Sequence, residues 1–417
     1  MNILIPIFSD AFLHPLHKDN DLSLLYVRHV GDKEGRMICI NHPECGDKEA
    51  IDEIKNNHTH FYITPDVKKI KHIFPNTRLI DANYFHWWDK NIPLDLENIR
   101  VNAYDFFHSK YYNVKKLNEI IPFTKHKEYC DRVFDKINEY VKQCYETEYH
   151  SDVTTAFSSI EKHGVKVSAD VCDIFDERVR KHISNAKLYS NYNLWTSTGR
   201  PSNSFGSVNF AALPPEKRSA FIPENDSLVE FDFDAYHLRL IGELVDYQFG
   251  EESVHQHLAD FYGSTYEESK QISFKLLYGG ITKDIQEKVP FFKKVQDFIN
   301  LKWNEFNRNN HVLTDIYNRR INLSDNEMNR NKLFNYLIQA FETERNIKRI
   351  LVIQKYLENK KTNLVLYGYD SFLFDFDKTD GVDTLTNIKN ILEKDNYPTK
   401  VKMGYTYSKM NDITNRL

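Results

Sequence analysis

The sequence has little glycine and proline and no apolar run long enough to cross a bilayer. Its 417 residues include 14 glycines and 13 prolines, which argues against long disordered linkers. A membrane-spanning helix needs about 20 consecutive apolar residues, so we expect no membrane partner. The N-terminal segment MNILIPIFSDAF lacks the basic flank and cleavage site of a signal peptide. We therefore expect a cytoplasmic globular protein.

The sequence also lacks any CxxC spacing. Such a spacing would indicate a zinc or redox site. Its absence predicts free thiols in a reducing cytosol for all five cysteines, which are Cys39, Cys45, Cys130, Cys144 and Cys172.

An excess of positive charge is missing as well, since the net charge is −5. This is only weak evidence against a nucleic-acid partner, because local basic strips can neutralise phosphates on an acidic protein. Lysines and arginines cluster at 68–71 and 319–320. For the first cluster, a solvated helix face is the more economical interpretation. The hydrophobic content of 41% and charged content of 28% are ordinary for a soluble protein of two or three domains.

The first 110 residues alternate short β-type runs with polar helical stretches, a pattern typical of an α/β domain. Residues 31–35 predict a hairpin turn, and 47–54 and 67–74 predict helices. From 111 to 190 the pattern turns helical, with Val133 and Ile137 on one apolar face. From 191 onwards the sequence predicts a strand over 228–233, helices over 235–245, 252–280, 290–308 and 331–358, and a hairpin over 362–376.

Two aspartates stand out by their position. Asp232 ends an apolar strand, and Asp370 lies at the tip of a hairpin, 138 positions later (370 − 232). Taken singly, each is more typical of a turn or a cap. Brought together by the fold, two carboxylates would suit Mg²⁺ and phosphoryl transfer.

Several short motifs surround these aspartates. In chain order they are TGR at 198–200, KRSAFI at 217–222, DFDAYHLR at 232–239, KQISFKLLYG at 270–279, NYLIQ at 335–339, YDS at 369–371 and VKMG at 401–404. Each is weak alone, but in this order and spacing they resemble the motifs of the family A DNA polymerases. The resemblance extends from about Tyr149 to the C-terminus. It implies an α+β, multidomain fold, with a right-hand palm-and-fingers polymerase core over 191–417 and the fingers at about 250–330.

The resemblance implies roles for individual residues. Asp232, Asp370 and the backbone carbonyl of Phe233 would hold two Mg²⁺ ions, for which Mn²⁺ can substitute. Lys270, Phe274 and Tyr278 share one helix face and would close over the incoming dNTP, with Lys270 also assisting catalysis. Further nucleotide contacts would come from Phe233, His237 and His255. Primer-template DNA would be bound by Arg200, Asn209, Arg239, Asn335, Gln339 and Tyr369.

Three side chains depart from the family pattern. His237 replaces the glutamate that excludes the ribose 2′-hydroxyl. Tyr266 replaces a fingers-helix arginine, so part of the triphosphate charge must be neutralised elsewhere. Ser371 replaces a glutamate beside the second aspartate.

Two larger regions also depart. Only 33 positions (198 − 165) stand where the family has its helical thumb, too few for a long helix pair at ~1.5 Å per residue. We expect a vestigial thumb within a helical connector at 111–190, and a partner protein for processivity. Residues 1–110 resemble, faintly, an RNase H-like exonuclease domain. It would be degenerate, since its DxE pairs lie in a turn and at a helix start, and Asp81 is the only other candidate acid.

The sequence therefore predicts a DNA polymerase without proofreading. The composition, rich in Asn, Lys, Ile and Tyr, favours a phage or virus origin and thus the host cytoplasm. One alternative is a single-subunit RNA polymerase-like enzyme. The other is a non-catalytic polymerase-derived module that binds DNA.

Overall fold

The computed structural model of the chain describes residues 1–46, 49–57, 59–96, 99, 101–111, 114, 116–141, 146–203, 208–249, 253–322 and 328–417. Within helices, the side chains at 172, 278 and 279 are also left undescribed. Helices, two five-stranded sheets, one three-stranded sheet and two two-stranded sheets make up the described structure, so the predicted α+β class is confirmed. None of the described helices has the length and apolarity needed to span a membrane.

The N-terminal sheet has the strand order β3-β2-β1-β4-β5. Its strands are β1 (Asn2–Phe8), β2 (Leu22–His29), β3 (Arg36–Cys39), β4 (Phe61–Thr64) and β5 (Arg78–Asp81). β1, β2 and β3 pair antiparallel, which confirms the hairpin predicted around 31–35. β4 pairs parallel with β1 and with β5. Two apolar cores, one on each face of this sheet, cover alternate residues of β1 such as Ile3 and Leu4.

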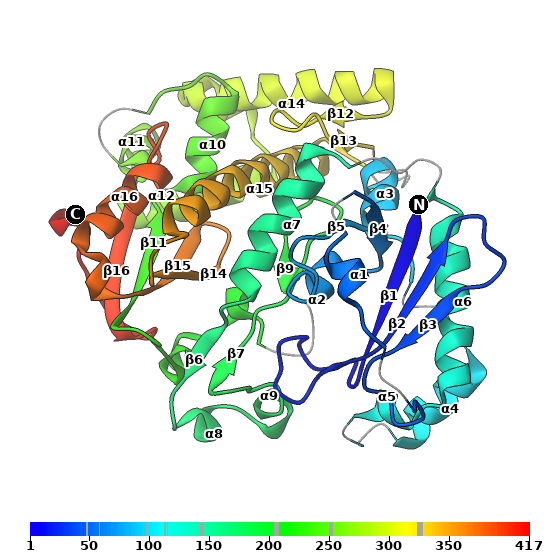
Figure 1. Cartoon of the computed structure of the whole chain (residues 1–417). Coiled ribbons are helices and arrows are strands. Elements are labelled where there is room, and N and C mark those ends of the chain that lie inside the picture. The colour runs from blue at the N-terminus through cyan, green and yellow to red at the C-terminus, as the bar shows by residue number, and fades with distance from the viewer. Residues whose placement is uncertain are drawn as a thin grey trace.

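Helices of 4 to 16 residues pack around this sheet (Figure 1). They are α1 (Asp52–Lys55), α2 (Val67–Ile70), α3 (Ala82–Lys90), α4 (Asn102–Tyr111), α5 (Leu117–Ile120) and α6 (Phe123–Asn138). α1 and α2 are shorter than predicted, and residues 47 and 48 of the first predicted helix lie outside the described residues. On α6 the predicted apolar face is confirmed, because Val133 and Ile137 are buried against the sheet.

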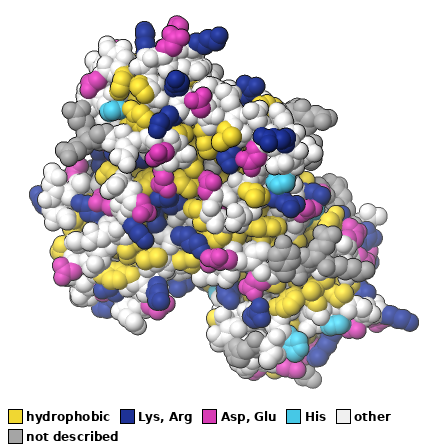
Figure 2. Space-filling model, turned by 90° about the horizontal axis from the view of Figure 1, so that it is seen from above, with side chains coloured by type: hydrophobic (Ala, Val, Ile, Leu, Met, Phe, Trp, Pro, Cys, Tyr) yellow, Lys and Arg dark blue, Asp and Glu magenta, His cyan; other side chains and the backbone are white. Residues whose placement is uncertain are grey.

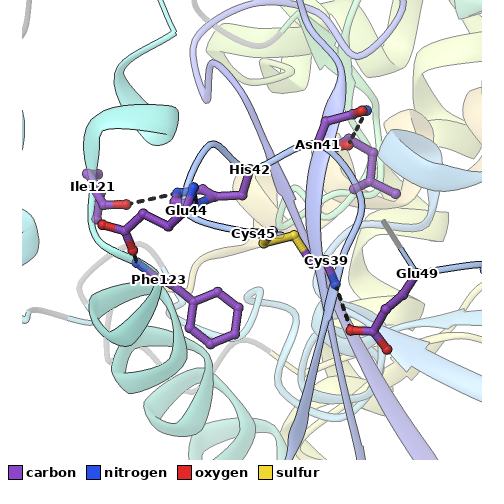
Figure 3. Close-up of a disulfide and its surroundings, with 9 residues drawn as sticks. Cys39, Asn41, His42, Glu44, Cys45, Glu49, Ile121 and Phe123 are labelled. Atoms are coloured by element: carbon purple, nitrogen blue, oxygen red, sulfur yellow. Dashed lines mark hydrogen bonds between the residues drawn. A yellow bond between two sulfur atoms is a disulfide. The ribbon is translucent and has the colours of Figure 1, made fainter. Parts of the chain in front are cut away.

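The prediction of five free thiols was wrong for Cys39 and Cys45, which form a disulfide (Figure 3). Cys39 ends β3, and the chain turns back within six residues, so that the two Cα atoms lie 6.2 Å apart. This separation is within the usual range for a disulfide. Cys130 is a free thiol inside α6, and burial raises its pKa. Cys144 and the side chain of Cys172 lie outside the described residues.

A connector joins the N-terminal sheet to the second half of the chain. It contains α7 (Glu148–Glu161), β6 (Val165–Val167), α8 (Val171–Ile174), α9 (Glu177–Arg180), β7 (Lys187–Leu188), β8 (Tyr192–Asn193), β9 (Ser202–Asn203), η2 (Phe210–Ala212), η3 (Pro215–Ala220) and β10 (Phe221–Ile222). Between 165 and 198, where every backbone position is described, the only helices are α8 and α9, of four residues each. A long helix pair is therefore absent from this segment, as the residue count predicts.

The C-terminal sheet is entirely antiparallel, with the order β14-β15-β11-β16-β17. Its strands are β11 (Ser227–Phe233), β14 (Asn363–Tyr367), β15 (Ser371–Phe376), β16 (Thr399–Thr406) and β17 (Lys409–Asp412). Helices α15 (Arg330–Leu357) and α16 (Val382–Leu392) pack on it through residues such as Ile350 and Ile388 (Figure 1). The predicted strand at 228–233 and the hairpin at 362–376 are confirmed. Two 3-10 turns, η4 (Lys378–Asp380) and η5 (Thr414–Arg416), complete this half.

A helical lobe follows β11. It contains α10 (Tyr236–Leu244), α11 (Val254–Tyr262), α12 (Tyr266–Gly279), α13 (Lys283–Lys288), α14 (Pro290–Asn309), β12 (Val312–Leu313) and β13 (Arg320–Ile321). The helix predicted over 252–280 is divided in two. Gly263 ends α11 with a left-handed φ of 67°, and a capping box of Thr265 and Glu268 starts α12.

The N-terminal half packs tightly on the rest of the chain. Trp87 of α3 belongs to the same apolar core as the C-terminal sheet, and its indole N–H donates to the carbonyl of Thr196 at 2.6 Å. A buried ion pair, Lys68 with Glu161 at 3.0 Å, joins α2 to α7. Seen from above, Lys and Arg side chains are interspersed with Asp and Glu (Figure 2). The domain boundaries predicted near residues 110 and 190 stay predictions.

Candidate active site

The two predicted catalytic aspartates lie on neighbouring strands. Asp232 is the penultimate residue of β11 and pairs in register with Ser371, the first residue of β15. Asp370 directly precedes Ser371, and its carbonyl accepts a hydrogen bond from the N–H of Phe233 at 2.9 Å. The fold therefore brings together two acids that are far apart in the sequence.

The electrostatics of this pair favour a cation. Burial raises the pKa of Asp232 to about 6, and the Asp370 and Glu230 carboxylates add to the increase. Burial also raises the pKa of Asp370, and the Glu342 carboxylate acts in the same direction. Two partly buried carboxylates that repel each other are stabilised in their ionised forms by bound positive charge.

Across β11 and β16, acids face lysines. Asp232 pairs in register with Lys400, and Glu230 with Lys402. Lys400 also forms an ion pair with Asp234 at 3.0 Å. Sequence analysis missed Lys400; the signal available was its place in a strand next to the VKMG motif.

The hairpin tip that carries Asp370 is held by α15. Tyr369 has a left-handed φ of 73°, which is unusual for a bulky residue. Its carbonyl accepts a hydrogen bond at 2.8 Å from Asn346, which also donates to the Tyr367 hydroxyl at 3.0 Å. The Tyr236 hydroxyl in turn donates to the Asn346 amide oxygen at 2.6 Å. Asn346, which sequence analysis missed, therefore fixes the turn beside the second aspartate.

The TGR loop reaches the same place. Gly199 has a left-handed φ of 77°, and a Cβ there would lie 3.1 Å from the Arg319 guanidinium. This turn directs Arg200 onto the ring of Tyr369, at 3.9 Å from its guanidinium carbon to the ring centroid. Arg200 also pairs with the buried carboxylate of Glu342, with 3.0 Å between Nε and Oε2. The structure therefore places Arg200 and Tyr369 together beside Asp370.

His237 and the predicted DNA contacts of α15 line one small cavity. His237 comes from the first turn of α10, while Asn335 and Gln339 are one turn apart on α15. Leu277 of α12 closes the other side. The Nε2 atom of His237 lies 3.2 Å from Oε1 of Glu342.

Lys270 and Tyr266 of α12 lie close to His255 of α11. The Lys270 ammonium lies 4.6 Å from the ring centroid of Tyr266, and the same ring packs edge-on against His255. The Nδ1 atom of His255 is buried, with no hydrogen-bond partner in the described structure. Burial lowers the pKa of His255, and the Lys270 charge lowers it further. Phe274, one turn after Lys270, is 52% exposed; the side chain of Tyr278 lies outside the described residues.

Two predicted DNA contacts are occupied by local structure. Asn209 caps η2 by accepting from the N–H of Ala212. Arg239 folds back onto Asp234, donating to its carbonyl at 3.0 Å and lying 3.6 Å from its carboxylate. Neither side chain forms a hydrogen bond or an ion pair with Asp232 or Asp370 in the described structure, and their predicted roles stay predictions.

The donor set at the aspartates is small. Among the described residues, no three or more His, Cys, Asp or Glu side chains gather closely enough to hold a metal ion. Asp232 and Asp370 form a pair of hard oxygen donors, which suits Mg²⁺ when water or substrate phosphates complete the coordination. The residues present therefore fit a two-carboxylate metal site that keeps open positions for substrate.

The fold is that of a DNA polymerase POL domain. The chain matches the structure of the POL domain of Pol1 from M. smegmatis in complex with DNA primer-template and dNTP, with a TM-score of 0.66 and 13% sequence identity. The match covers 98% of this chain and 95% of that one. No protein-family model and no curated protein sequence matches the chain.

Proposed function

We propose that this protein is a template-directed DNA polymerase that extends a primer with dNTPs, of the family A kind. The observation that carries the proposal is the pair Asp232 and Asp370 at adjacent strand positions, within a fold shared with a DNA polymerase domain. The raised pKa of Asp232, about 6, is typical of functional sites, where repelling charges are held together for chemistry.

Asp232, Asp370 and the carbonyl of Phe233 are the proposed ligands of two Mg²⁺ ions, or of Mn²⁺. Bound there, the ions would lower the pKa of the primer 3′-hydroxyl and stabilise the charge of phosphoryl transfer. The protein's own part is to hold two ionised carboxylates in fixed positions. Asn346 supports this role, because it locks the turn that carries Asp370.

The nucleotide would lie between this pair and α12. Lys270 and the unpartnered Nδ1 of His255 are the proposed contacts of the triphosphate. Phe274, which is exposed on the same helix face as Lys270, is the proposed contact of the sugar and base. Lys400, opposite Asp232 in the sheet, supplies positive charge that the family places on an arginine at the position of Tyr266. Lysine suits a polyphosphate as a compact charge.

The DNA would lie along the TGR loop and α15. Arg200 and Tyr369, stacked on each other, and Asn335 and Gln339, one turn apart on α15, are the proposed contacts of the primer-template duplex. Contacts with the backbone and the minor-groove edge check the shape of a base pair without reading the sequence.

Primer extension tests the proposal. A 5′-labelled primer on a longer template is incubated with the protein, dNTPs and Mg²⁺, and wild type is expected to extend it. Asp232→Ala and Asp370→Ala should each reduce extension by on the order of 10³-fold or more while leaving DNA binding intact. Asp383→Ala, at an exposed acid on α16, is the control and should extend normally. Full extension by both site variants would reject the assignment.

His237, in place of the family glutamate, is the observation that favours a second candidate, an RNA polymerase-like enzyme. The same assay with rNTPs separates the two, since a DNA polymerase should prefer dNTPs by a large factor. DNA binding without extension by either substrate would instead indicate a non-catalytic module.

We also propose that the polymerase has low processivity and works with a partner protein. The support is the segment 165–198, which contains only α8 and α9 where the family has a thumb. Excess trap DNA, added with the dNTPs, should limit products to a few nucleotides per encounter. Long products under these conditions would overturn this part. A phage or virus origin stays a proposal from composition.

A further inference from the structure

Glu342 is a carboxylate close to the aspartate pair that belongs to none of the sequence motifs. Glu342 lies in the middle of α15 and its side chain is fully buried. Burying an ionised carboxylate is costly unless it is paired. Its two partners come from separate segments, Arg200 from the TGR loop at 3.0 Å and His237 from α10 at 3.2 Å.

The geometry of the second contact restricts His237. A carboxylate only accepts hydrogen bonds, and the Nε2–Oε1 separation of 3.2 Å is within hydrogen-bonding range. A hydrogen bond at this contact requires the proton on Nε2, and forming it would set both the tautomer and the orientation of the ring. The second carboxylate oxygen, Oε2, forms an ion pair with Nε of Arg200 at 3.0 Å, which restrains Glu342 from following a moving histidine.

The restraint on His237 matters because of where its ring lies. Its ring lines the small cavity between α10, α12 and α15, five residues after Asp232 and across from Leu277. It therefore lies between the aspartate pair and the helix that carries Lys270. A side chain at this place meets the sugar of a nucleotide whose phosphates reach the aspartates.

We infer that Glu342 is a positioning residue that holds the His237 ring against the sugar of the incoming nucleotide, and that this pair sets discrimination between deoxyribose and ribose. The inference rests on the proposed polymerase function. A ring excludes a 2′-hydroxyl only if it cannot swing aside, and the ion-paired Glu342 supplies this rigidity. A glutamate from another helix thus compensates for the one that the motif at 232–239 lacks.

The experiment measures kcat/KM for dNTP and for rNTP opposite the same template base, and compares the ratio among variants. Glu342→Gln keeps the side-chain size but removes the charge, so its amide oxygen can accept only a neutral hydrogen bond from His237. The ratio should fall about tenfold through greater use of rNTP, the effect of weakening one charge-assisted hydrogen bond. Glu344→Gln is the matched control, because Glu344 is equally buried two residues away and pairs with Arg319 instead. Its ratio should equal that of wild type.

A double-mutant cycle tests whether Glu342 acts through the histidine. His237→Phe keeps a ring but cannot bond to Glu342, so its ratio should also fall about tenfold. Adding Glu342→Gln to His237→Phe should then change the ratio less than twofold, because the coupling is already lost. If Glu342→Gln fails to fold, as judged by thermal melting, Glu342→Asp and the single variant His237→Phe carry the test.

The outcomes separate this inference from the proposed function. If wild type extends a primer with neither substrate, the polymerase proposal itself fails. If wild type is active but Glu342→Gln lowers kcat/KM for both substrates equally, Glu342 is merely structural and the inference is overturned. If His237→Phe discriminates between dNTP and rNTP as well as wild type does, the inference is also overturned, because the bulk of a ring would then exclude rNTP without a contact to Glu342.

Discussion

The two five-stranded sheets both place aspartates at strand ends, but they use them differently. In the N-terminal sheet, Asp81 ends β5 and its carboxylate accepts from the N–H groups of Val67 and Asn83, at 3.1 and 2.9 Å. Asp66, just after β4, caps α2 by accepting from Lys68. These carboxylates satisfy the free donors at helix starts, a structural task.

In the C-terminal sheet the corresponding acids have no such task. Among the described residues, neither the Asp232 nor the Asp370 carboxylate accepts a hydrogen bond from the start of a helix. Burial raises the pKa of both strand-end acids, Asp81 to about 7 and Asp232 to about 6, so the two sheets differ in the hydrogen-bond partners of their carboxylates and not in the direction of the pKa shift. The comparison teaches that a strand-end aspartate whose oxygens cap a helix stabilises the fold, whereas one whose oxygens no helix start engages is held ready for a ligand.

The largest expected effect is on the pH dependence of activity. The pKa of Asp232 is raised to about 6, so the ionised fraction of its carboxylate falls as the pH drops below that value. Primer extension should fall about tenfold per pH unit below pH 6. Raising the Mg²⁺ concentration should move this fall to lower pH, because metal and protons compete for the same oxygens. A profile that is flat between pH 4 and pH 6 would contradict the site.

The next largest effect is on stability, in the N-terminal sheet. Asp66→Ala removes the cap of α2, and the free energy of unfolding should fall by about 1 to 2 kcal/mol. Denaturant titration measures this, and extension per folded molecule should stay unchanged. Loss of extension without loss of stability would mean that this acid serves the active site.

In the C-terminal sheet, removing a carboxylate is expected to raise the free energy of unfolding instead of lowering it. Because the folded-state pKa of Asp232 lies above its ordinary value, the ionised carboxylate costs stability above pH 6. That cost disappears as the pH falls through about 4, where the unfolded chain is protonated too. Asp232→Asn should therefore stabilise the fold by about 1 kcal/mol at pH 7, after allowance for solvent screening, and by nothing at pH 3. Thermal melts at the two pH values provide the measurement, and destabilisation at pH 7 would show that the carboxylate has a structural partner.

The last prediction is an absence of 3′→5′ exonuclease activity. Incubation with labelled DNA and Mg²⁺ but without dNTPs should give no 3′→5′ degradation, because the oxygens of Asp81 are engaged by backbone donors. The degenerate exonuclease-type assignment is overturned by degradation that Asp81→Ala abolishes.

Much of this fold could be predicted from the sequence where a local pattern was strong. The apolar alternation of 228–233 and the hairpin around Gly368 were both correct, and the motifs selected Asp232 and Asp370 before any geometry was known. The boundary inside 252–280 was missed, although Gly263 and the capping pair Thr265 and Glu268 were visible signals for it.

The remaining parts depended on a turn geometry and on tertiary contacts that no local sequence pattern indicated. The Cys39–Cys45 disulfide follows from a turn after β3 that no spacing rule indicates. Glu342 and Asn346 looked like ordinary polar residues of a long helix. They are buried because α15 packs on the C-terminal sheet, and only then do their side chains meet His237 and Tyr369.

By itself, the sequence determined which residues can carry the chemistry. Ordered motifs record residue types, and Asp232, Asp370 and Lys270 are recognisable as types at a spacing. Only the tertiary structure decided how these side chains are restrained. Restraint comes from packing and pairing between α10, α15, the TGR loop and the sheet, and such contacts are set by distances in space, which the order of residues along the chain does not specify.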